Sequence, residues 1–295
     1  MTTKLYKIAL CFDKNYLSHV NALVASILSS NKKNKEKFFF YFFFLWDSNN
    51  IVMNLPQHQY QFIYMNENIF DGLKDCLYLW KAAYMRLHIP NILKQEDKIL
   101  YLDSDIIVNW DITKLRSFDL KDKYFAVCSE NNISMFNSWV MLINIQEWRT
   151  GKITDILLDF IKNNPDKIVV ADQSALNICI PKKKVFLLPP IYNQTIQFRL
   201  SPIWSEYKKL LLLINIWFNS VVIHFNGKQK PWNFWCEHPL WFLYYKYTAT
   251  FTYKMFIMML YNFFYSIARF FWSYIIKLLM YVYDKFNFLL KKYLK

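Results

Sequence analysis

The sequence has 295 residues and a net charge of +14, with 55% apolar and 20% aromatic residues. That length allows one or two domains with a full hydrophobic core. The five cysteines are widely spaced and none forms a CxxC pair, which argues against a disulfide framework or a zinc finger. The first sixteen residues contain too short an apolar run for a signal peptide, so we expect a cytoplasmic catalytic part.

The N-terminal residues predict a strand, a polar turn and a helix in that order. The strand covers 7–12, the turn covers 13–16, and Leu23 and Ile27 then recur at helical spacing. At the start of an α/β chain this order is a common place for a nucleotide to bind. Because the turn has no glycine-rich loop, a dinucleotide fingerprint and a P-loop are excluded, and phosphates would be held by a metal and side chains.

The middle of the chain alternates between strand and helix patterns. We expect strands over 38–46 (a central strand), 61–65, 125–130, 138–145, 185–191 and 221–227, and helices over 79–93 and 147–161. Arg86, midway along the first of these helices, lies either on a solvated face or at a phosphate. Asp172 suits a helix N-cap. Gly227, one of three glycines, indicates a backbone conformation that other residues rarely adopt.

Two carboxylates interrupt an apolar run at 98–108, KILYLDSDIIV. The run is typical of a buried strand, and isolated charges are expensive to bury there. On an extended chain Asp103 and Asp105 would leave the same face and could bind one oxygen-preferring cation such as Mg²⁺ or Mn²⁺. The alternative is an ordinary turn at a strand end. The flanking strand favours the metal site.

Residues 241–295 differ from the rest, being aromatic, rich in methionine and basic, with eight Lys or Arg and one acidic residue. Their charge suits anionic lipid, nucleic acid or plain solubility. Arg269 in the middle of the apolar stretch argues against a membrane span, and the apolar runs argue against a nucleic-acid groove. We expect a helix lying in a lipid interface rather than a soluble core helix. Its polar stripe comprises Asn262, Ser266, Arg269, Ser273 and Lys277.

Six motifs in series resemble the family 8 glycosyltransferases, in particular the bacterial lipopolysaccharide galactosyl- and glucosyltransferases. They run from about residue 8 to 232 and read FDKNY, YMRL, LYLDSDIIV, FNSWVMLIN, DQSALN and HFNGKQKPW. The resemblance implies a GT-A fold, a Rossmann-like α/β domain with a mixed sheet flanked by helices, over 1–240, with residues 241–295 as a helical membrane-association tail. It also implies a metal-dependent, retaining transfer of a hexose.

The resemblance further implies the reactants and the place of the reaction. The donor would be UDP-glucose or UDP-galactose with Mn²⁺ or Mg²⁺, and the acceptor a lipid-linked lipopolysaccharide or lipooligosaccharide core. The enzyme would be peripheral, at the cytoplasmic face of the bacterial inner membrane, held to the anionic surface by its tail and without a nucleic-acid partner.

The family's roles transfer to matching positions of this sequence. The metal ligands would be Asp103, Asp105 and His224. The donor would meet Asp13, Asn15 and Tyr16 around the nucleoside, Arg86 and Ser104, Asn137 and Ser138 near the sugar, and Gly227 and Lys230 at the diphosphate. Gln173, near the anomeric carbon, and Asp172 would be catalytic. Because a neutral amide is a poor nucleophile, front-face attack within an ion pair would explain retention.

One position departs from the family pattern. Trp139 stands where the family usually has glycine, so an indole either occupies the sugar pocket or points into the core. The sugar preference is therefore open. The alternative function is a catalytically silent, membrane-associated protein that kept the fold.

Overall fold

The computed structural model describes residues 5–34, 37–45, 53, 55–56, 59–73, 80–129, 135–195, 214–227, 230–233, 236, 238, 240–248 and 253–293. Residues 1–224 with 247–249 form one compact unit, and residues 225–246 with 250–295 form another. The functional division expected at residue 240 stays a prediction.

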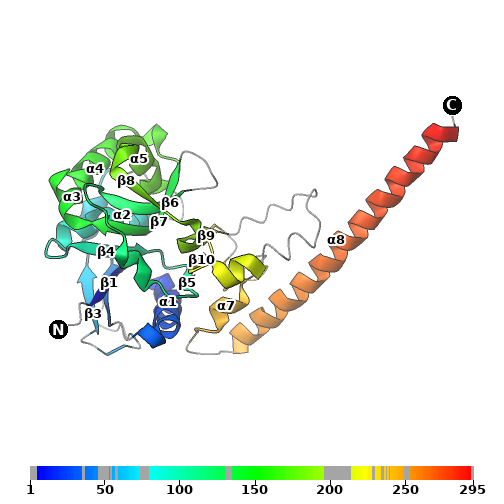
Figure 1. The fold of residues 1–295 in the computed structure, drawn as a ribbon, viewed down its shortest axis with the longest axis horizontal. Coiled ribbons are helices and arrows are strands. Elements are labelled where there is room, and N and C mark those ends of the chain that lie inside the picture. The colour runs from blue at the N-terminus through cyan, green and yellow to red at the C-terminus, as the bar shows by residue number, and fades with distance from the viewer. Residues whose placement is uncertain are drawn as a thin grey trace. The chain divides into compact units, whose positions relative to one another are not determined.

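A seven-stranded mixed sheet forms the centre of the first unit, in the order β3-β2-β1-β4-β7-β6-β8 (Figure 1). Strands β1, β2, β3 and β4 run parallel, whereas β7 is antiparallel to both β4 and β6. Most expected strands are thus confirmed, including the phenylalanine-rich β2 between two neighbours, but the strand expected over 185–191 ends at Leu188 and the one expected over 221–227 covers only Val222–His224. Their bounds are β1 Tyr6–Cys11, β2 Phe38–Phe44, β3 Tyr60–Tyr64, β4 Lys98–Leu102, β6 Phe125–Ser129, β7 Phe136–Asn144 and β8 Val185–Leu188.

A second, three-stranded sheet contains β5 (Ile106–Val108), β10 (Val222–His224) and β9 (Gln194–Thr195), in that order. The single strand expected over 98–108 is therefore wrong. β4 ends at Leu102 and pairs with β1 and β7, while β5 pairs with β10. Ser104 and Asp105 lie in the turn between the two sheets, so the two carboxylates do not share one face of an extended strand.

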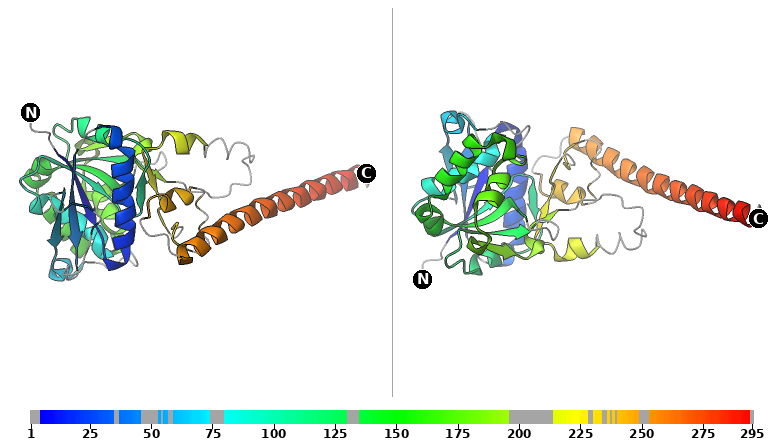
Figure 2. Two further views of the ribbon diagram at one scale, coloured as in Figure 1. Left: turned by 90° about the horizontal axis from the view of Figure 1, so that it is seen from below. Right: turned by 90° about the horizontal axis from the view of Figure 1, so that it is seen from above.

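Helices cover both faces of the main sheet (Figures 1 and 2). The α1 helix (Leu17–Ser30) packs on one face through Leu23 and Ile27. The opposite face carries α2 (Trp80–Ile92), α3 (Ile145–Thr150), α4 (Ile153–Asn163) and α5 (Ala171–Cys179). Short 3-10 helices occupy Lys14–Tyr16, Lys32–Asn34, Glu67–Phe70, Thr113–Ser117, Pro165–Lys167, Lys182–Lys184 and Pro190–Tyr192.

The single helix expected over 147–161 is two helices, and this prediction was wrong. α3 ends at Thr150 and α4 begins at Ile153. Lys152 between them has φ of 51°, a left-handed conformation that ends an α-helix. A Cβ on Gly151 would lie 3.0 Å from the Tyr124 ring, a tight contact that glycine at the break avoids.

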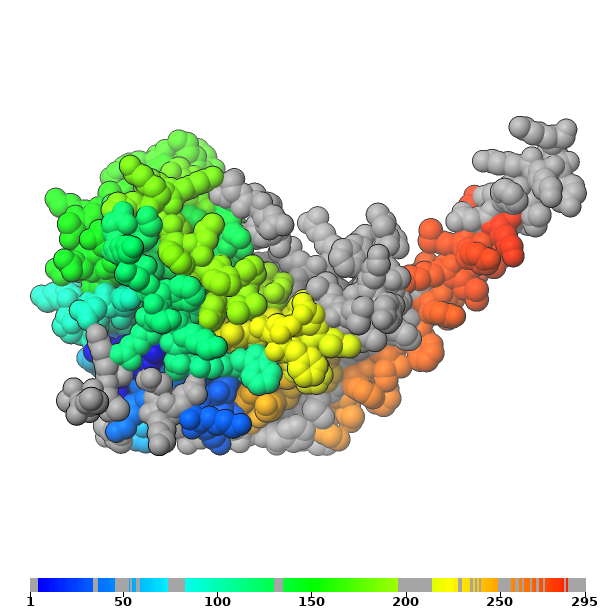
Figure 3. Space-filling view, viewed as in Figure 1, coloured from blue at the N-terminus to red at the C-terminus, as the bar shows by residue number. Residues whose placement is uncertain are grey.

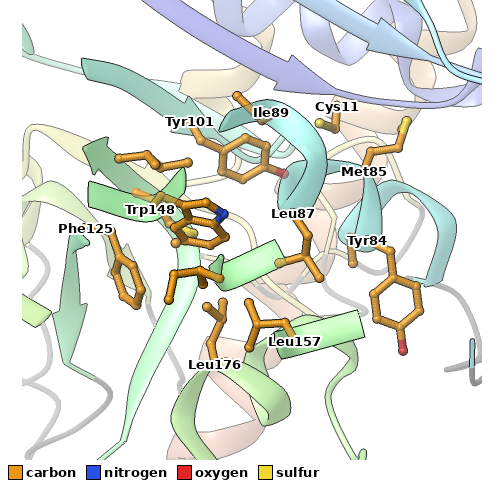
Figure 4. Close-up of a cluster of buried hydrophobic side chains, with 14 of the residues drawn as sticks. Cys11, Tyr84, Met85, Leu87, Ile89, Tyr101, Phe125, Trp148, Leu157 and Leu176 are labelled. Carbon is orange, nitrogen blue, oxygen red and sulfur yellow. The ribbon is translucent and has the colours of Figure 1, made fainter. Parts of the chain in front are cut away.

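The core under α2–α5 is organised around Trp148, which Figure 4 shows between Phe125 and Leu87. Its ring centroid lies 5.8 Å from that of Phe125. Its buried indole N–H donates to Thr154 Oγ1 at 3.0 Å, and that hydroxyl donates to Leu87 O at 2.7 Å. The Trp148 N–H and the Thr154 hydroxyl are thereby satisfied, and the two hydrogen bonds join α3 and α4 to α2, from which Arg86 projects.

The second unit contains α7 (Phe242–Tyr245) and the 41-residue helix α8 (Tyr253–Tyr293), which confirms a helical C-terminal segment. Of the expected polar stripe, only the side chain of Lys277 lies within the described part. Large apolar side chains of α8 are exposed, for example Phe264 at 62%, Trp272 at 65% and Tyr283 at 65%. Figure 3 draws the described side chains of α8 in orange and red. Within the described residues, no helix is long and apolar enough to cross a membrane.

Ser26 joins α1 to the strand that follows the two carboxylates. Its buried hydroxyl accepts from Val108 N at 2.9 Å and donates to Leu23 O at 2.6 Å. We expect Ser26→Ala to lower the free energy of unfolding by about 1–3 kcal/mol, because Val108 N–H is left buried without an acceptor. Urea unfolding followed by circular dichroism measures the change. Ser117→Ala, at an exposed hydroxyl, is the control, and equal stability of both variants would contradict the prediction.

Candidate active site

A cavity of about 90 Å³ opens at one edge of the main sheet. The C-terminal ends of β1 and β4 meet there because these neighbouring strands are parallel. The start of β7 reaches the same edge because β7 is antiparallel to β4. The cavity is lined by Cys11, Phe12, Asp13, Tyr16, Ala83, Arg86, Tyr101, Asp103, Ser104, Asp105, Ser138, Trp139, Val170, Ala171, Asp172 and Gln173.

Asp103, Asp105 and His224 converge beside this cavity, and one ligand atom from each lies within 4.8 Å of the others. His224 Nε2 is 2.9 Å from Asp105 Oδ1. The small sheet brings them together, because β10 pairs antiparallel with β5 and places His224 opposite Ile106. The turn after β4 supplies both aspartates.

These residues fit a divalent cation. Two carboxylates and one imidazole form a suitable ligand set for Mn²⁺, and also supply the oxygen ligands that Mg²⁺ prefers. Burial raises the pKa of the Asp103 carboxyl; the Arg86 guanidinium opposes the shift and Asp105 adds to it. A cation between the side chains would compensate for the buried negative charge.

Arg86 lies in the interior of the unit, with only 5% of its surface exposed, so the solvated-face alternative is wrong. Its Nη1 is 3.2 Å from Asp103 Oδ1, and its Nε is 3.4 Å from Asp172 Oδ2. Nη1 also donates to Ser138 O. The guanidinium carbon lies 4.6 Å from the centroid of the Tyr101 ring. Arg86 therefore connects α2 with the turn after β4, with β7 and with α5.

Asp172 lies in the first turn of α5, where Val170 is the N-cap, so the N-cap interpretation is wrong. Its side chain is turned inward and is 2% exposed. Burial raises the pKa of its carboxyl to about 6, although Arg86 opposes the shift. One guanidinium is shared between Asp172 and the half-buried Asp103, which explains why the effect of burial on the Asp172 carboxyl outweighs that of the ion pair.

Gln173 and Ser138 meet on the wall of the cavity. Gln173 Oε1 accepts from Ser138 N at 3.3 Å, which joins α5 to β7. Ala171, the first residue of α5, has φ of 34°, an unusual conformation for a residue with a Cβ. It immediately precedes the two residues that the family resemblance assigns to catalysis.

The residues expected around the nucleoside lie at the end of β1. Asp13 Oδ1 accepts from the backbone N–H groups of Asn15 at 2.7 Å and Tyr16 at 3.2 Å, so it caps the short helix that follows. Asp13 and Tyr16 line the cavity, whereas Asn15 is exposed and is not among the lining residues. Ser104 Oγ donates to Cys11 O at 3.0 Å and ties the turn after β4 to β1.

The remaining predicted residues do not line the cavity. Asn137 is buried and accepts a hydrogen bond from Asn193 Nδ2. Gly227 has φ of 71°, which confirms its unusual conformation, and Lys230 Nζ donates to Phe225 O at 2.7 Å. Both belong to the second unit, and their role at a diphosphate stays a prediction.

Trp139 lines the cavity, and its ring centroid lies 4.9 Å from that of His224 at an interplanar angle of 89°. Two residues at the site were not predicted from the sequence. Tyr101 donates its hydroxyl to Asp103 Oδ1 at 2.6 Å, and Asn193 is hydrogen-bonded to His224. In the sequence, Asn193 could be singled out only as a carboxamide residue directly after the apolar segment VFLLPPIY.

Comparisons with known proteins agree with this architecture. The model of the family described as Glycosyl transferase family 8 matches residues 7–236. A lipopolysaccharide 1,2-glucosyltransferase of Escherichia coli (strain K12) is 27% identical over 81% of this chain and 76% of its own length. General stress protein A of Bacillus subtilis (strain 168) is 26% identical over 78% of this chain and 88% of its own length.

Solved structures show the same fold. The galactosyltransferase LgtC, in complex with donor and acceptor sugar analogues, superimposes with a TM-score of 0.70 at 20% identity, covering 85% of this chain and 99% of LgtC. This agreement confirms the expected GT-A fold. The family match spans most of the first unit and extends into the second, and it includes every residue of the cavity. The chain therefore belongs to glycosyl transferase family 8.

Proposed function

We propose that this protein is a metal-dependent, retaining glycosyltransferase that moves glucose or galactose from a UDP-sugar to a lipid-linked lipopolysaccharide core. The observation that carries the proposal is the convergence of Asp103, Asp105 and His224 at the edge of the cavity. The similarity to the Escherichia coli lipopolysaccharide 1,2-glucosyltransferase supports the class of acceptor.

A divalent cation held by Asp103, Asp105 and His224 would act as a Lewis acid on the departing diphosphate. Tyr101 and Arg86 hold Asp103 from two sides, through the phenolic hydroxyl and the guanidinium. The ligand carboxylate is therefore fixed before any donor binds, and no reorganisation is required at the moment of reaction.

The donor would lie along the cavity from the end of β1 to the start of α5. Asp13, Asn15 and Tyr16 would contact the nucleoside, and Ser104, Asn137 and Ser138 the donor near the sugar. Gly227 and Lys230 would close over the diphosphate, where a lysine neutralises growing negative charge. Arg86 would act through the carboxylates that it holds.

Gln173 and Asp172 remain the proposed catalytic residues, both on the cavity wall. Gln173 Oε1 is engaged by Ser138 N, and an amide oxygen is a weak nucleophile. Asp172 is paired with Arg86. These contacts support front-face departure and attack on the same side of the sugar, with the two side chains stabilising the ion pair.

We place the enzyme at the cytoplasmic face of a bacterial inner membrane, where a lipid-linked acceptor is accessible. The exposed apolar side chains of α8 and the basic residues of its segment support attachment to an anionic surface.

The function is tested by incubating the purified protein with a panel of UDP-sugars, with and without Mn²⁺, and measuring the UDP released. We expect release from UDP-glucose or UDP-galactose that requires the metal. No release from any donor, with or without a lipid-linked acceptor, would favour the catalytically silent alternative.

We expect Asp103→Asn and Asp105→Asn each to lower Mn²⁺-dependent turnover at least about 100-fold, because loss of an outer partner of a metal ligand alone costs 10–100-fold. Each change removes an anionic ligand while nearly preserving volume. The rate of UDP release measures the effect, and circular dichroism checks the fold. Asp119→Asn, at an exposed carboxylate, is the matched control. Full turnover in both active-site variants would refute the metal assignment.

We expect Trp139→Gly to change the ratio of UDP-glucose to UDP-galactose turnover by about tenfold, as is common when a group that shapes a pocket is lost. The half-buried indole lines the cavity, so its loss enlarges the sugar site. The midpoint of thermal unfolding should shift less than for a fully buried tryptophan, whose truncation lowers the free energy of unfolding by about 3–5 kcal/mol. Trp110→Gly, at an exposed tryptophan, should leave the ratio unchanged. An unchanged ratio with a large loss of stability would show that Trp139 is a core residue.

We expect the triple variant Phe264→Ser, Trp272→Ser, Tyr283→Ser to bind anionic vesicles at least about tenfold more weakly, because each ring loses apolar burial. At helical spacing the three positions lie within about 100° of one another. Sedimentation with phosphatidylglycerol vesicles measures binding. The control replaces exposed apolar residues of the first unit, Val169, Ile178 and Leu187, with serine. Equal binding of the two triple variants would place the attachment elsewhere in the chain.

A further inference from the structure

We infer that Asn193 is a positioning residue of the candidate metal centre, which holds the His224 imidazole in the tautomer whose Nε2 lone pair faces the cation. Asn137 in turn fixes the orientation of the Asn193 carboxamide. This inference rests on the proposed metal-dependent function. It adds Asn193 as a residue that acts through a ligand, and it gives Asn137 a second role besides its proposed contact with the donor.

Three buried side chains form a row that leads from β7 to the candidate site. Asn193 Nδ2 donates to Asn137 Oδ1, and Asn193 Oδ1 lies 3.1 Å from His224 Nδ1. The opposite ring nitrogen, Nε2, lies 2.9 Å from Asp105 Oδ1. Asn137, Asn193 and His224 are exposed by 2%, 5% and 1%, so solvent does not compete for these hydrogen bonds.

The direction of each hydrogen bond determines the next. A carboxamide nitrogen only donates and its oxygen only accepts. Asn193 Nδ2 donates to Asn137, so the oxygen of Asn193 faces His224. Because that oxygen only accepts, Nδ1 of His224 must carry the hydrogen. In the neutral imidazole the lone pair is then on Nε2. That lone pair and the Asp105 carboxylate face each other, an arrangement that a shared cation stabilises.

The backbone around Asn193 fixes this contact. Asn193 follows the short helix Pro190–Tyr192, and its N–H donates to Pro190 O at 3.0 Å. Directly after it, β9 pairs in parallel with β10 and places Thr195 opposite His224. Val221 N donates to Ile191 O at 2.8 Å on the other side. Asn193 and His224 therefore sit on adjoining, hydrogen-bonded segments, and the segment that carries the amide cannot shift without breaking the small sheet.

The Trp139 ring packs against the His224 imidazole and restricts it from a second direction. The two ring centroids are 4.9 Å apart and the interplanar angle is 89°. Asn137 and Trp139 are two residues apart on β7, so their side chains leave the same face of the strand. One side of β7 thus supplies both the outer hydrogen-bond partner and the packing surface for His224. Outer partners of this kind orient a ligating histidine and raise its basicity.

The test measures Mn²⁺ affinity by calorimetry, in parallel with the thermal unfolding midpoint in metal-free buffer and the affinity for uridine without metal. We expect Asn193→Leu to weaken Mn²⁺ binding by about 10- to 100-fold, because the acceptor for Nδ1–H is lost. Asn193→Asp, which keeps an acceptor at that place, should bind Mn²⁺ within a few-fold of the wild type. Uridine affinity should be unchanged in both.

Asn31→Leu is the matched control, because Asn31 is also buried and hydrogen-bonded at both ends, to Ile27 O and from Ile112 N, away from the cavity. It should lower the midpoint without weakening Mn²⁺ binding. If Asn193→Leu does not fold, the pair Asn137→Leu and Asn137→Asp provides the same comparison one side chain further out, with weaker binding expected for the leucine variant only.

The outcomes distinguish a failure of the proposed metal centre from a failure of the positioning role of Asn193. No Mn²⁺ binding by the wild type, or binding unaffected by His224→Ala, would overturn the proposed metal centre itself. Binding that depends on His224 and stays unchanged in Asn193→Leu would overturn only the positioning role. Equal losses in Asn193→Leu and Asn31→Leu would also overturn it, because they would reflect general destabilisation.

Discussion

The structure of the first unit depends on one buried guanidinium between a half-buried carboxylate and a buried one. Arg86 comes from α2, Asp103 from the turn after β4, and Asp172 from the first turn of α5. Each ion would cost several kcal/mol to bury alone, so these segments are stable in their present positions only together. One positive charge does not balance two negative charges, and burial therefore keeps the pKa of both carboxyls raised. The site consequently favours additional positive charge next to Asp103, where Asp105 and His224 also meet.

The chain forms two sheets, and their arrangement explains how Asp103, Asp105 and His224 come close together. β4 ends inside the main sheet, the chain turns through Ser104 and Asp105, and β5 continues in the small sheet. Because β10 pairs with β5, His224 arrives from a distant part of the chain beside the turn. The same small sheet includes β9, which begins directly after Asn193. His224 and Asn193, its proposed outer partner, are thus brought together by adjoining segments, while the aspartates belong to a turn whose ends are fixed by both sheets.

Local pattern predicted most strands and the outer helices well, because burial of an apolar face imposes a period that is visible in a short window. Prediction from local pattern failed at three places. Lys152 in the left-handed region divides one expected helix into α3 and α4. The turn through Ser104 and Asp105, which connects the two sheets, divides the single strand expected over 98–108 into β4 and β5. Asp172 looked like a cap from its place before an apolar run, yet it points inward to Arg86. The strand pairing of the turn and the ion pair of Asp172 involve residues outside the window that was read, whereas the left-handed Lys152 lies inside it.

The sequence by itself determined the family, the alternation of strands and helices, and the carboxylates that bind a cation in the proposed function, because these depend on residue types at short spacing. Tertiary structure alone decided that Arg86 is buried, that Trp139 packs against His224, and that Asn193 and Asn137 align behind the imidazole. These contacts join residues from separate strands and helices. Their geometry follows from sheet register and packing, which no local spacing of residues encodes.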